Sequence, residues 1–115
     1  MPEPKAAFMV IYRWRLKPGM ERPFVEAWTD ATRLLKAHAG GLGSRLHRTH
    51  DGEYLAYAMW PSEAARAASA KFETPERLRL RELMRESVAE AFPEVRLTPL
   101  ADLLELCEVD AAPLG

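Results

Sequence analysis

The chain has 115 residues, of which 48% are hydrophobic and 29% are charged, and its formal net charge is −1. This length fits one domain with an ordinary core, and the composition excludes a disordered or low-complexity chain. The balanced charge predicts no nucleic-acid partner and no membrane partner, and no apolar run reaches the roughly 18 residues that span a bilayer. The opening MPEPKAAFMVIYRW lacks the layout of a secretory signal, so we expect a cytoplasmic protein.

Residues 7–17 predict a first strand whose side chains alternate between two faces. One face carries Phe8, Val10, Tyr12, Trp14 and Leu16. The other face also begins with apolar residues, which indicates a strand covered on both sides. Apolar residues then recur at helical spacing over 24–38, and the glycines at 40 and 41 end this helix.

Residues 42–49 and 54–60 predict two strands of a hairpin, joined by the Asp51-Gly52 turn. Ser62 is a typical helix N-cap, and it predicts a short helix to about residue 72. Thr74, followed by Pro75, predicts a second helix that Phe92-Pro93 closes.

A final strand is predicted within residues 102–108, where Cys107 would be a small buried hydrophobe. As the only cysteine, Cys107 also excludes an internal disulfide. We expect residues 109–115 to form a loose tail after a core of about 7–108.

The predicted order β–α–β–β–α–β indicates an α+β, ferredoxin-like fold in a single domain, residues 1–115. Such a fold has a four-stranded antiparallel sheet with helices on one face. The uncovered face then needs a partner, and the apolar character of the first strand favours a second copy of the chain. We therefore expect a homodimer.

The chain contains neither Asn nor Gln. Amide side chains are common clamps for carbonyl and oxyanion groups because they donate and accept hydrogen bonds together. Any chemistry here must instead use Arg, His, Tyr, Trp, Ser, Thr, carboxylates or backbone N–H groups. The sequence also has no phosphate-binding glycine loop and no paired spacing of metal ligands.

Two groups of residues form a recognisable pattern. The first contains Tyr12-Arg13-Trp14, Pro18-Gly19, Glu21, Phe24, Ala27 and Trp28, and the second contains Gly43 to Arg48, Asp51-Gly52 and Tyr57 to Ser62. Together they resemble the antibiotic-biosynthesis-monooxygenase (ABM) type of domain over about residues 7–108. The resemblance implies a dimeric α/β barrel, in which two ferredoxin-like sheets face each other.

The resemblance implies several activities. The superfamily includes cofactor-free monooxygenases of aromatic polyketides or quinols, haem-degrading enzymes, and members without a known activity. Its oxygenases and haem degraders typically use an Asn, which this chain lacks, and residues 62–91 contain no histidine that could ligate haem. We therefore expect no cofactor.

Five aromatic residues on the predicted strands and first helix are candidates for binding a small aromatic molecule: Tyr12, Trp14, Trp28, Tyr57 and Trp60. Their rings could form a flat apolar pocket between sheet and helices. They could equally be core, because aromatic side chains dominate cores by area alone.

Arg45 and His47 are the candidate catalytic residues, because they share one face of the second strand. Arg45 could hold a phenol hydroxyl while His47 removes its proton as the base. The alternative is an edge strand with two solvated side chains, or a dimer-interface ion pair.

Two functions stay open. One is a cofactor-independent monooxygenase of a phenol- or quinol-type substrate, and the other is a non-catalytic dimeric barrel that binds a ligand or acts in stress.

Overall fold

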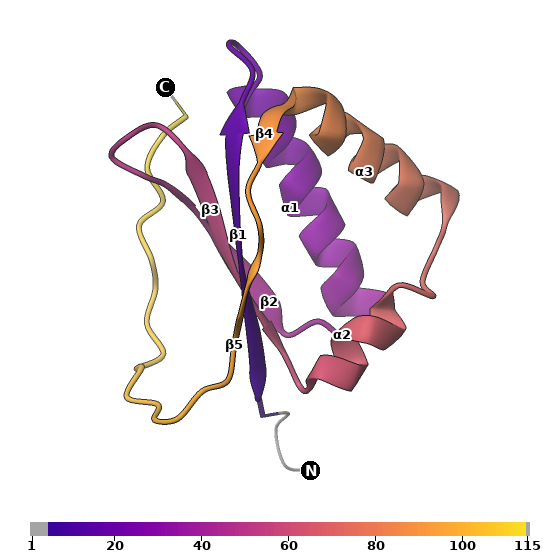
Figure 1. Cartoon of the computed structure of the whole chain (residues 1–115), viewed down its shortest axis with the longest axis vertical. Helices are drawn as coiled ribbons and strands as arrows, with labels where there is room; N and C mark the ends of the chain where they lie inside the picture. Colours follow the sequence, from indigo (N-terminus) through magenta and orange to yellow (C-terminus); the bar gives the residue numbers. More distant parts are fainter. Residues whose placement is uncertain (1–4, 115) are drawn as a thin grey trace.

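The computed structural model describes residues 5–114 and shows an antiparallel sheet with three helices on one face (Figure 1). The elements in chain order are β1 (Phe8–Leu16), α1 (Glu21–His38), β2 (Gly43–Arg48), β3 (Tyr54–Trp60), α2 (Glu63–Ser69), α3 (Pro75–Ser87), β4 (Val88–Ala91) and β5 (Val95–Leu97). The predicted α+β, ferredoxin-like class is confirmed. The sheet order is β2-β3-β1-β4, with β5 also paired to β1.

Strands β4 and β5 together occupy the position of one interrupted edge strand. Strand β4 pairs with Trp14–Leu16 of β1, and β5 pairs with Met9–Ile11 of the same strand. Between them the backbone N–H of Phe92 still donates to the carbonyl of Arg13 at 3.0 Å. Pro93 then interrupts the ladder, because proline has no N–H to donate.

The predicted last strand, residues 102–108, is wrong. This segment is exposed and has no regular structure, and Cys107 is exposed rather than buried. The predicted end of the last helix is also wrong, because α3 ends at Ser87. The carbonyl of Ser87 accepts a hydrogen bond from the N–H of Lys17 at 2.9 Å. The chain therefore joins the edge of β1 directly after Ser87, five residues earlier than the predicted helix end at Phe92.

The helix starts at Ser62 and Thr74 are confirmed. The Ser62 hydroxyl accepts from the N–H of Ala65 at 3.0 Å, and that of Thr74 accepts from the N–H of Arg77 at 3.1 Å. Each side chain thereby satisfies one of the N–H groups that a first turn leaves free. These caps separate α2 from α3, so the second helical region covers the sheet in two pieces.

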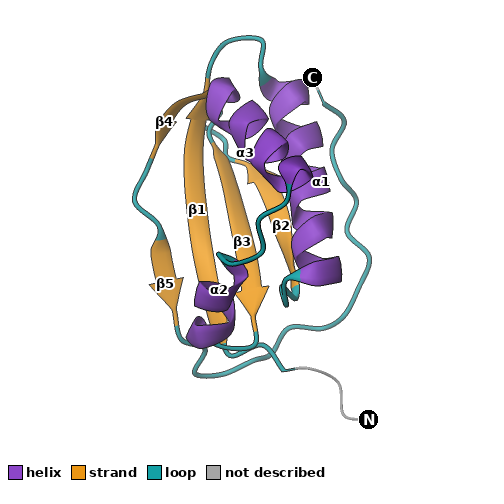
Figure 2. Cartoon of the chain, turned by 90° about the vertical axis from the view of Figure 1, so that its right-hand side faces the viewer, coloured by secondary structure: helices purple, strands orange, loops and turns teal. Residues whose placement is uncertain are grey.

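Alternation along β1 and β3 sets the two faces of the sheet. Phe8 pairs with Trp60, and Tyr12 pairs with Ala56, on the face that α1 and α3 cover (Figure 2). Phe8, Val10 and Trp60 form the core of this layer, and Phe24 of α1 and Leu80 of α3 are almost fully buried. Burial of each of these two side chains stabilises the fold by roughly 1.5–3 kcal/mol.

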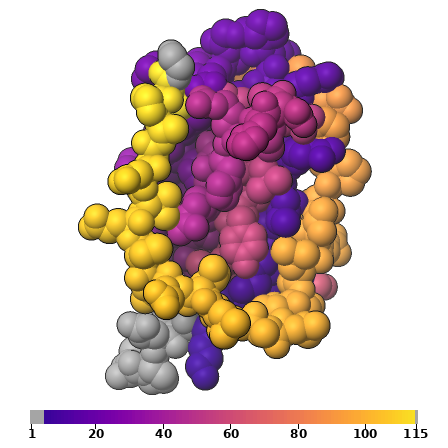
Figure 3. Space-filling model, turned by 90° about the vertical axis from the view of Figure 1, so that its left-hand side faces the viewer, coloured from indigo at the N-terminus to yellow at the C-terminus, as the bar shows by residue number. Residues whose placement is uncertain are grey.

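The opposite surface of the sheet, called the outer face, carries Met9, Ile11 and Arg13 of β1 and Tyr57 of β3. No helix covers it (Figure 1). After β5 the chain runs as an extended segment along one margin of this face (Figure 3). Leu100, Leu103, Leu104 and Leu106 in that segment are 78–104% exposed.

Residues 1–4 and 115 of the predicted single domain and tail lie outside the described residues. A single chain supplies one such sheet, so the closure of two sheets into a barrel stays a prediction. No helix within residues 5–114 has both the length and the apolar character to cross a membrane.

Replacing Thr74 with Ala should lower the free energy of unfolding by about 1 kcal/mol, because the first turn of α3 loses its cap. Chemical denaturation at one fixed protein concentration measures the loss. Thr98→Ala is the matched control, since Thr98 is exposed and lies outside the helices and strands. Equal stability of the Thr74 and Thr98 variants would contradict the assigned cap.

Candidate functional site

A cavity of about 310 Å³ lies between the sheet and the two longer helices, α1 and α3. We call it the helix-side cavity. Its aromatic wall consists of Tyr12, Trp14, Trp28 and Trp60. Leu35 of α1 and Met84 of α3 add apolar surface from the helix layer. Most of the lining is therefore apolar, which suits a small aromatic molecule.

Four of the five predicted binding residues line this one cavity, and the fifth does not. Tyr57 pairs with Ile11 and Arg45, on the outer face. Because side chains alternate along a strand, Tyr57 points away from Ala56 and Ala58, whose face the helices cover. The structure thus separates Tyr57 from the other aromatic candidates.

Tyr12 and Trp14 stack on each other, with ring centroids 5.8 Å apart and an interplanar angle of 9°. They are two residues apart on β1, so their side chains stand on the same face of the sheet. Trp14 also meets Phe24 edge-on, with centroids 5.1 Å apart. Part of the aromatic wall is thus fixed by the core beneath it.

Two residues of the lining have buried polar atoms that find no hydrogen-bond partner among residues 5–114, the indole Nε1 of Trp60 and the hydroxyl of Ser44. Trp60 itself is only 4% exposed. A buried polar group left without a partner costs about 1–3 kcal/mol. An oxygen atom of a bound ligand would supply the missing acceptor for either group.

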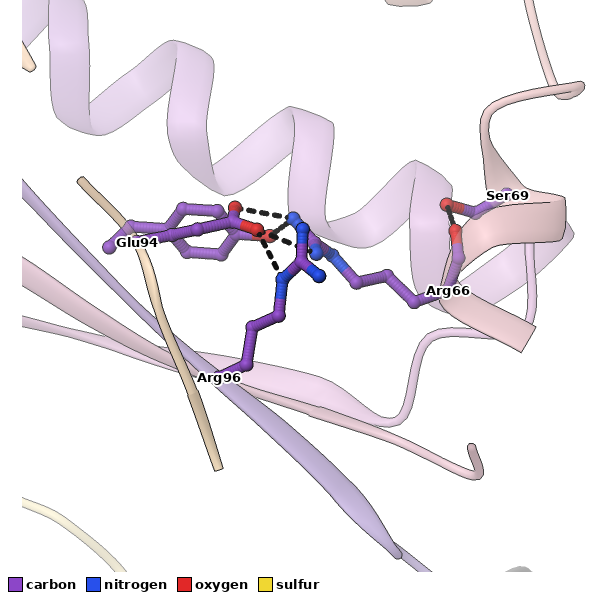
Figure 4. Close-up of polar contacts among 5 residues, drawn as sticks. Arg66, Ser69, Glu94 and Arg96 are labelled. Atoms are coloured by element: carbon purple, nitrogen blue, oxygen red, sulfur yellow. Dashed lines mark hydrogen bonds and ion pairs between the residues drawn. The ribbon is translucent and has the colours of Figure 1, made fainter. Parts of the chain in front are cut away.

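The Tyr12 hydroxyl is held by a network of polar contacts from α2, β5 and the connection between β4 and β5. Arg66 of α2 donates to the Tyr12 oxygen at 2.9 Å and to both carboxylate oxygens of Glu94 at 2.6 and 2.9 Å. Arg96 of β5 donates to the same carboxylate at 3.1 Å. Figure 4 shows both guanidinium groups converging on Glu94.

These contacts set the protonation states of the group. The hydrogen bond from Arg66 is the main reason why the pKa of Glu94 lies below its usual value, and it outweighs partial burial. Burial raises the pKa of Tyr12, although the charge of Arg66 opposes this. Tyr12 is therefore a neutral phenol at pH 7 whose oxygen already accepts one hydrogen bond. Within residues 5–114 its proton has no acceptor, so it is free to meet a ligand.

Arg66, Glu94 and Arg96 are absent from the sequence-based candidates. Arg66 and Glu94 lie 28 residues apart, and Arg66 and Tyr12 lie 54 apart. No local spacing signals such a contact, because it depends on where the interrupted edge strand passes α2. The nearest signal is Pro93, which marks the break that frees Glu94 from the ladder.

Arg45 and His47 do not line the helix-side cavity. Both are exposed, and both line a separate hollow of about 670 Å³ between β2, Val25 of α1 and the chain end near Val109. His47 Nδ1 lies 3.2 Å from the carbonyl oxygen of Leu55. The sheet stands between this pair and Tyr12, whereas Trp28 lines both hollows and Tyr57 pairs with Arg45.

Two arginines on the outer side of β1 are paired at the surface. Arg13 lies 3.6 Å from Glu53 and stacks over Phe92, and Arg15 lies 2.7 Å from Glu90. Between residues 5 and 114 no three His, Cys, Asp or Glu side chains gather to hold a metal ion.

Comparison with known proteins gives a consistent result. Residues 7–74 match the family model for antibiotic biosynthesis monooxygenase. No curated protein matches the sequence. Among solved structures, SnoaB of Streptomyces nogalater, a cofactor-independent oxygenase, is similar at 16% identity and a TM-score of 0.70, over 88% of this chain and 100% of that one.

Two further solved structures share the fold. Rv0793 of Mycobacterium tuberculosis has 19% identity and a TM-score of 0.69, over 85% of this chain and 99% of that one. PA3566 of Pseudomonas aeruginosa has 18% identity and a TM-score of 0.66, over 87% of this chain and 100% of that one.

Replacing Glu94 with Gln should destabilise the protein by about 1 kcal/mol at pH 7, because Arg66 loses its ionic partner. The lowered pKa means that the carboxylate stabilises the fold above the ordinary Glu value of about 4.3. This contribution disappears as the pH falls through the lower, folded-state pKa. Denaturation curves between about pH 7 and pH 3 should therefore show wild type and variant converging in acid.

Glu76→Gln, which removes an exposed carboxylate from α3, is the control for the loss of one negative charge. A difference between wild type and Glu94→Gln that stayed constant down to the lowest pH would contradict the ionic role of Glu94.

Proposed function

Because the chain belongs to the antibiotic biosynthesis monooxygenase family, we propose that it is a cofactor-independent monooxygenase of a small phenol- or quinol-type substrate. The observation that carries this proposal is the helix-side cavity, which combines an aromatic wall with two buried polar atoms that lack partners. A hydroxylated ring would stack on the wall while its oxygen atoms accept the free hydrogen bonds.

The reaction needs no bound cofactor if the substrate supplies the electrons. A phenolate passes one electron to dioxygen, and the two radicals combine into a peroxide on a ring carbon. Loss of water then leaves a carbonyl, so one oxygen atom enters the product and the other leaves as water. The ring loses two hydrogen atoms in this process, which balances the reduction of dioxygen.

Residues of the cavity have distinct proposed roles in this reaction. The Nε1 of Trp60 and the hydroxyl of Ser44 would stabilise the charge that grows on the substrate oxygen. Tyr12 would donate its proton to the departing peroxide oxygen, because its own oxygen is occupied by Arg66. Arg66 and Glu94 would act as positioning residues through Tyr12.

Arg45 and His47 stay proposed catalytic residues for a substrate at the outer face, where His47 would be the base. Such a substrate would contact Tyr57 rather than the aromatic wall, since Tyr57 pairs with Arg45 in the ladder.

One observation favours the alternative of a binding protein without catalysis. Among residues 5–114, no His, Asp or Glu lines the helix-side cavity, so none of these usual general bases faces a ligand there. A phenol in this cavity would have to lose its proton to solvent or arrive ionised.

Oxygen uptake with 1,4-dihydroxynaphthalene tests the enzyme proposal. We expect uptake that depends on the protein and falls about tenfold or more in Tyr12→Phe, because the proton donor is lost. Tyr57→Phe is the matched control on the outer face and should retain full activity. A loss in His47→Ala with full activity in Tyr12→Phe would move the reaction to the outer face. No uptake above the buffer rate would leave only the binding function.

We also propose that two copies associate through their outer faces into a dimeric barrel. Proteins of this family are generally dimeric. The outer face presents Ile11 and Met59 without a helix above them, and the exposed leucines of residues 100–106 border it. A second copy would bury both surfaces at once, whereas large exposed apolar patches are unusual in monomers. A cytoplasmic location and the lack of nucleic-acid and membrane partners stay predictions.

Light scattering should give about twice the chain mass of 13.0 kDa at micromolar concentration. Ile11→Glu should shift the mass toward that of one chain, because the carboxylate would be buried without a partner. Leu78→Glu, on the exposed helix layer, is the control and should stay dimeric. A wild-type mass near that of one chain would refute the dimer.

A further inference from the structure

The charged side chains in the lining of the helix-side cavity all have one sign. Lys36 of α1 and Arg77 and Arg81 of α3 line it, and no Asp or Glu of the described residues 5–114 does. The chain as a whole has a net charge of −1, so this cationic group is a local departure from the overall balance. A partly enclosed site lined by one sign of charge concentrates ligands of the opposite sign.

Arg77 has no carboxylate partner within hydrogen-bond distance among residues 5–114. Its Nη1 donates to the backbone carbonyls of Ser69 and Phe72, at 2.5 and 2.6 Å. Partial burial and the neighbouring charge of Arg81 lower its pKa from the ordinary value. The carbonyls fix the position of the guanidinium without neutralising it, so its positive charge remains available to a ligand.

The two other cations are available as well. Lys36 forms no ion pair within the described part of the chain, and Arg81 has one contact with Glu73, at 3.5 Å between half-exposed side chains. A surface pair of this kind contributes little and can exchange with a ligand. Gly43, whose φ is +112°, lies next to the Lys36 side chain, since a Cβ on this glycine would be 3.8 Å from it.

The polar groups of the cavity fall on two sides. The unpartnered Trp60 and Ser44 are in the sheet, whereas Lys36, Arg77 and Arg81 are in the helix layer. A ligand that satisfied both sides would have a neutral or developing oxygen toward the sheet and a full negative charge toward the helices. A guanidinium fork matches a carboxylate in geometry as well as charge.

We infer that the helix-side cavity selects an aromatic acid, in which a hydroxylated ring carries a carboxylate that Lys36, Arg77 and Arg81 bind. This inference deepens the proposed function, since it names the substrate class for the same cavity. Binding is its direct consequence and needs no turnover.

Calorimetric titration with 6-hydroxy-2-naphthoic acid and its methyl ester tests the inference, because this acid carries its hydroxyl and carboxylate at opposite ends and the ester replaces the charge with a methyl group. We expect the acid to bind about tenfold more tightly than the ester at pH 7. The preference should shrink as the salt concentration rises from about 0.05 M to about 0.5 M, since salt screens the ionic contact. Equal affinities, or no binding of either ligand, would overturn the inference.

Single-residue variants test which side chains bind the carboxylate of the acid. Lys36→Met and Arg81→Met should each weaken binding of the acid several-fold and leave the ester unchanged. Arg85→Met is the matched control on the same helix, because Arg85 pairs with Glu82 and does not line the cavity. An equal loss in Arg85→Met, or an equal loss for acid and ester, would refute a specific carboxylate site.

The two proposals fail in different ways. Tighter binding of the acid than of the ester, measured without oxygen, would support the carboxylate site even if no substrate were oxidised. Oxidation of 1,4-dihydroxynaphthalene without any preference for the acid would leave the enzyme proposal intact and remove only the carboxylate site.

Discussion

The pairing of β1 with β3 is the constraint on which the rest of the molecule depends. Its register opposes Tyr12 to Ala56 and Val10 to Ala58, so at these two central pairs a larger side chain of β1 stands beside an alanine of β3. This leaves a layer of space under the helices that aromatic rings only partly fill. A shift of one residue would exchange the two faces and place Arg13 in the core. The helix-side cavity therefore follows from the register as much as from the residues that line it.

The interrupted edge strand connects the sheet to the site. A continuous strand would keep the backbone near residue 94 in the ladder. The strand is instead broken at Pro93, and the carboxylate of the next residue, Glu94, lies toward α2. There Glu94 meets Arg66, which in turn holds the hydroxyl of Tyr12. The irregularity is local, but its effect reaches the wall of the cavity through three side chains. Bulges and breaks at sheet edges commonly re-aim a side chain in this way.

Local signals made much of the fold predictable. The Asp51-Gly52 turn and the caps at Ser62 and Thr74 act over three or four residues, and each lies where the sequence indicates. The last strand was not predictable in this way. Residues 102–108 have the apolar pattern of a strand but no neighbour to pair with. The short β4 and β5 have weaker patterns, and their place is decided by contact with β1.

The candidate site was predictable only in part, for the same reason. Alternation along β1 and β3 is local, and it correctly puts Tyr12, Trp14 and Trp60 on one face. The Arg66–Glu94 contact and the cationic lining depend on how separate elements come together, which spacing along the chain does not encode. Arg45 and His47 look like a functional pair in the sequence, yet the sheet separates them from Tyr12, and Trp28 is the wall residue that also lines their hollow.

The exposure of Cys107 has a practical consequence. It is the only thiol of the chain, and it lies on the extended segment beyond β5 rather than in the core. A maleimide dye would therefore attach at one defined position without mutagenesis. Energy transfer between dyes on two copies would then report where each chain end lies in an assembly, in solution and in real time.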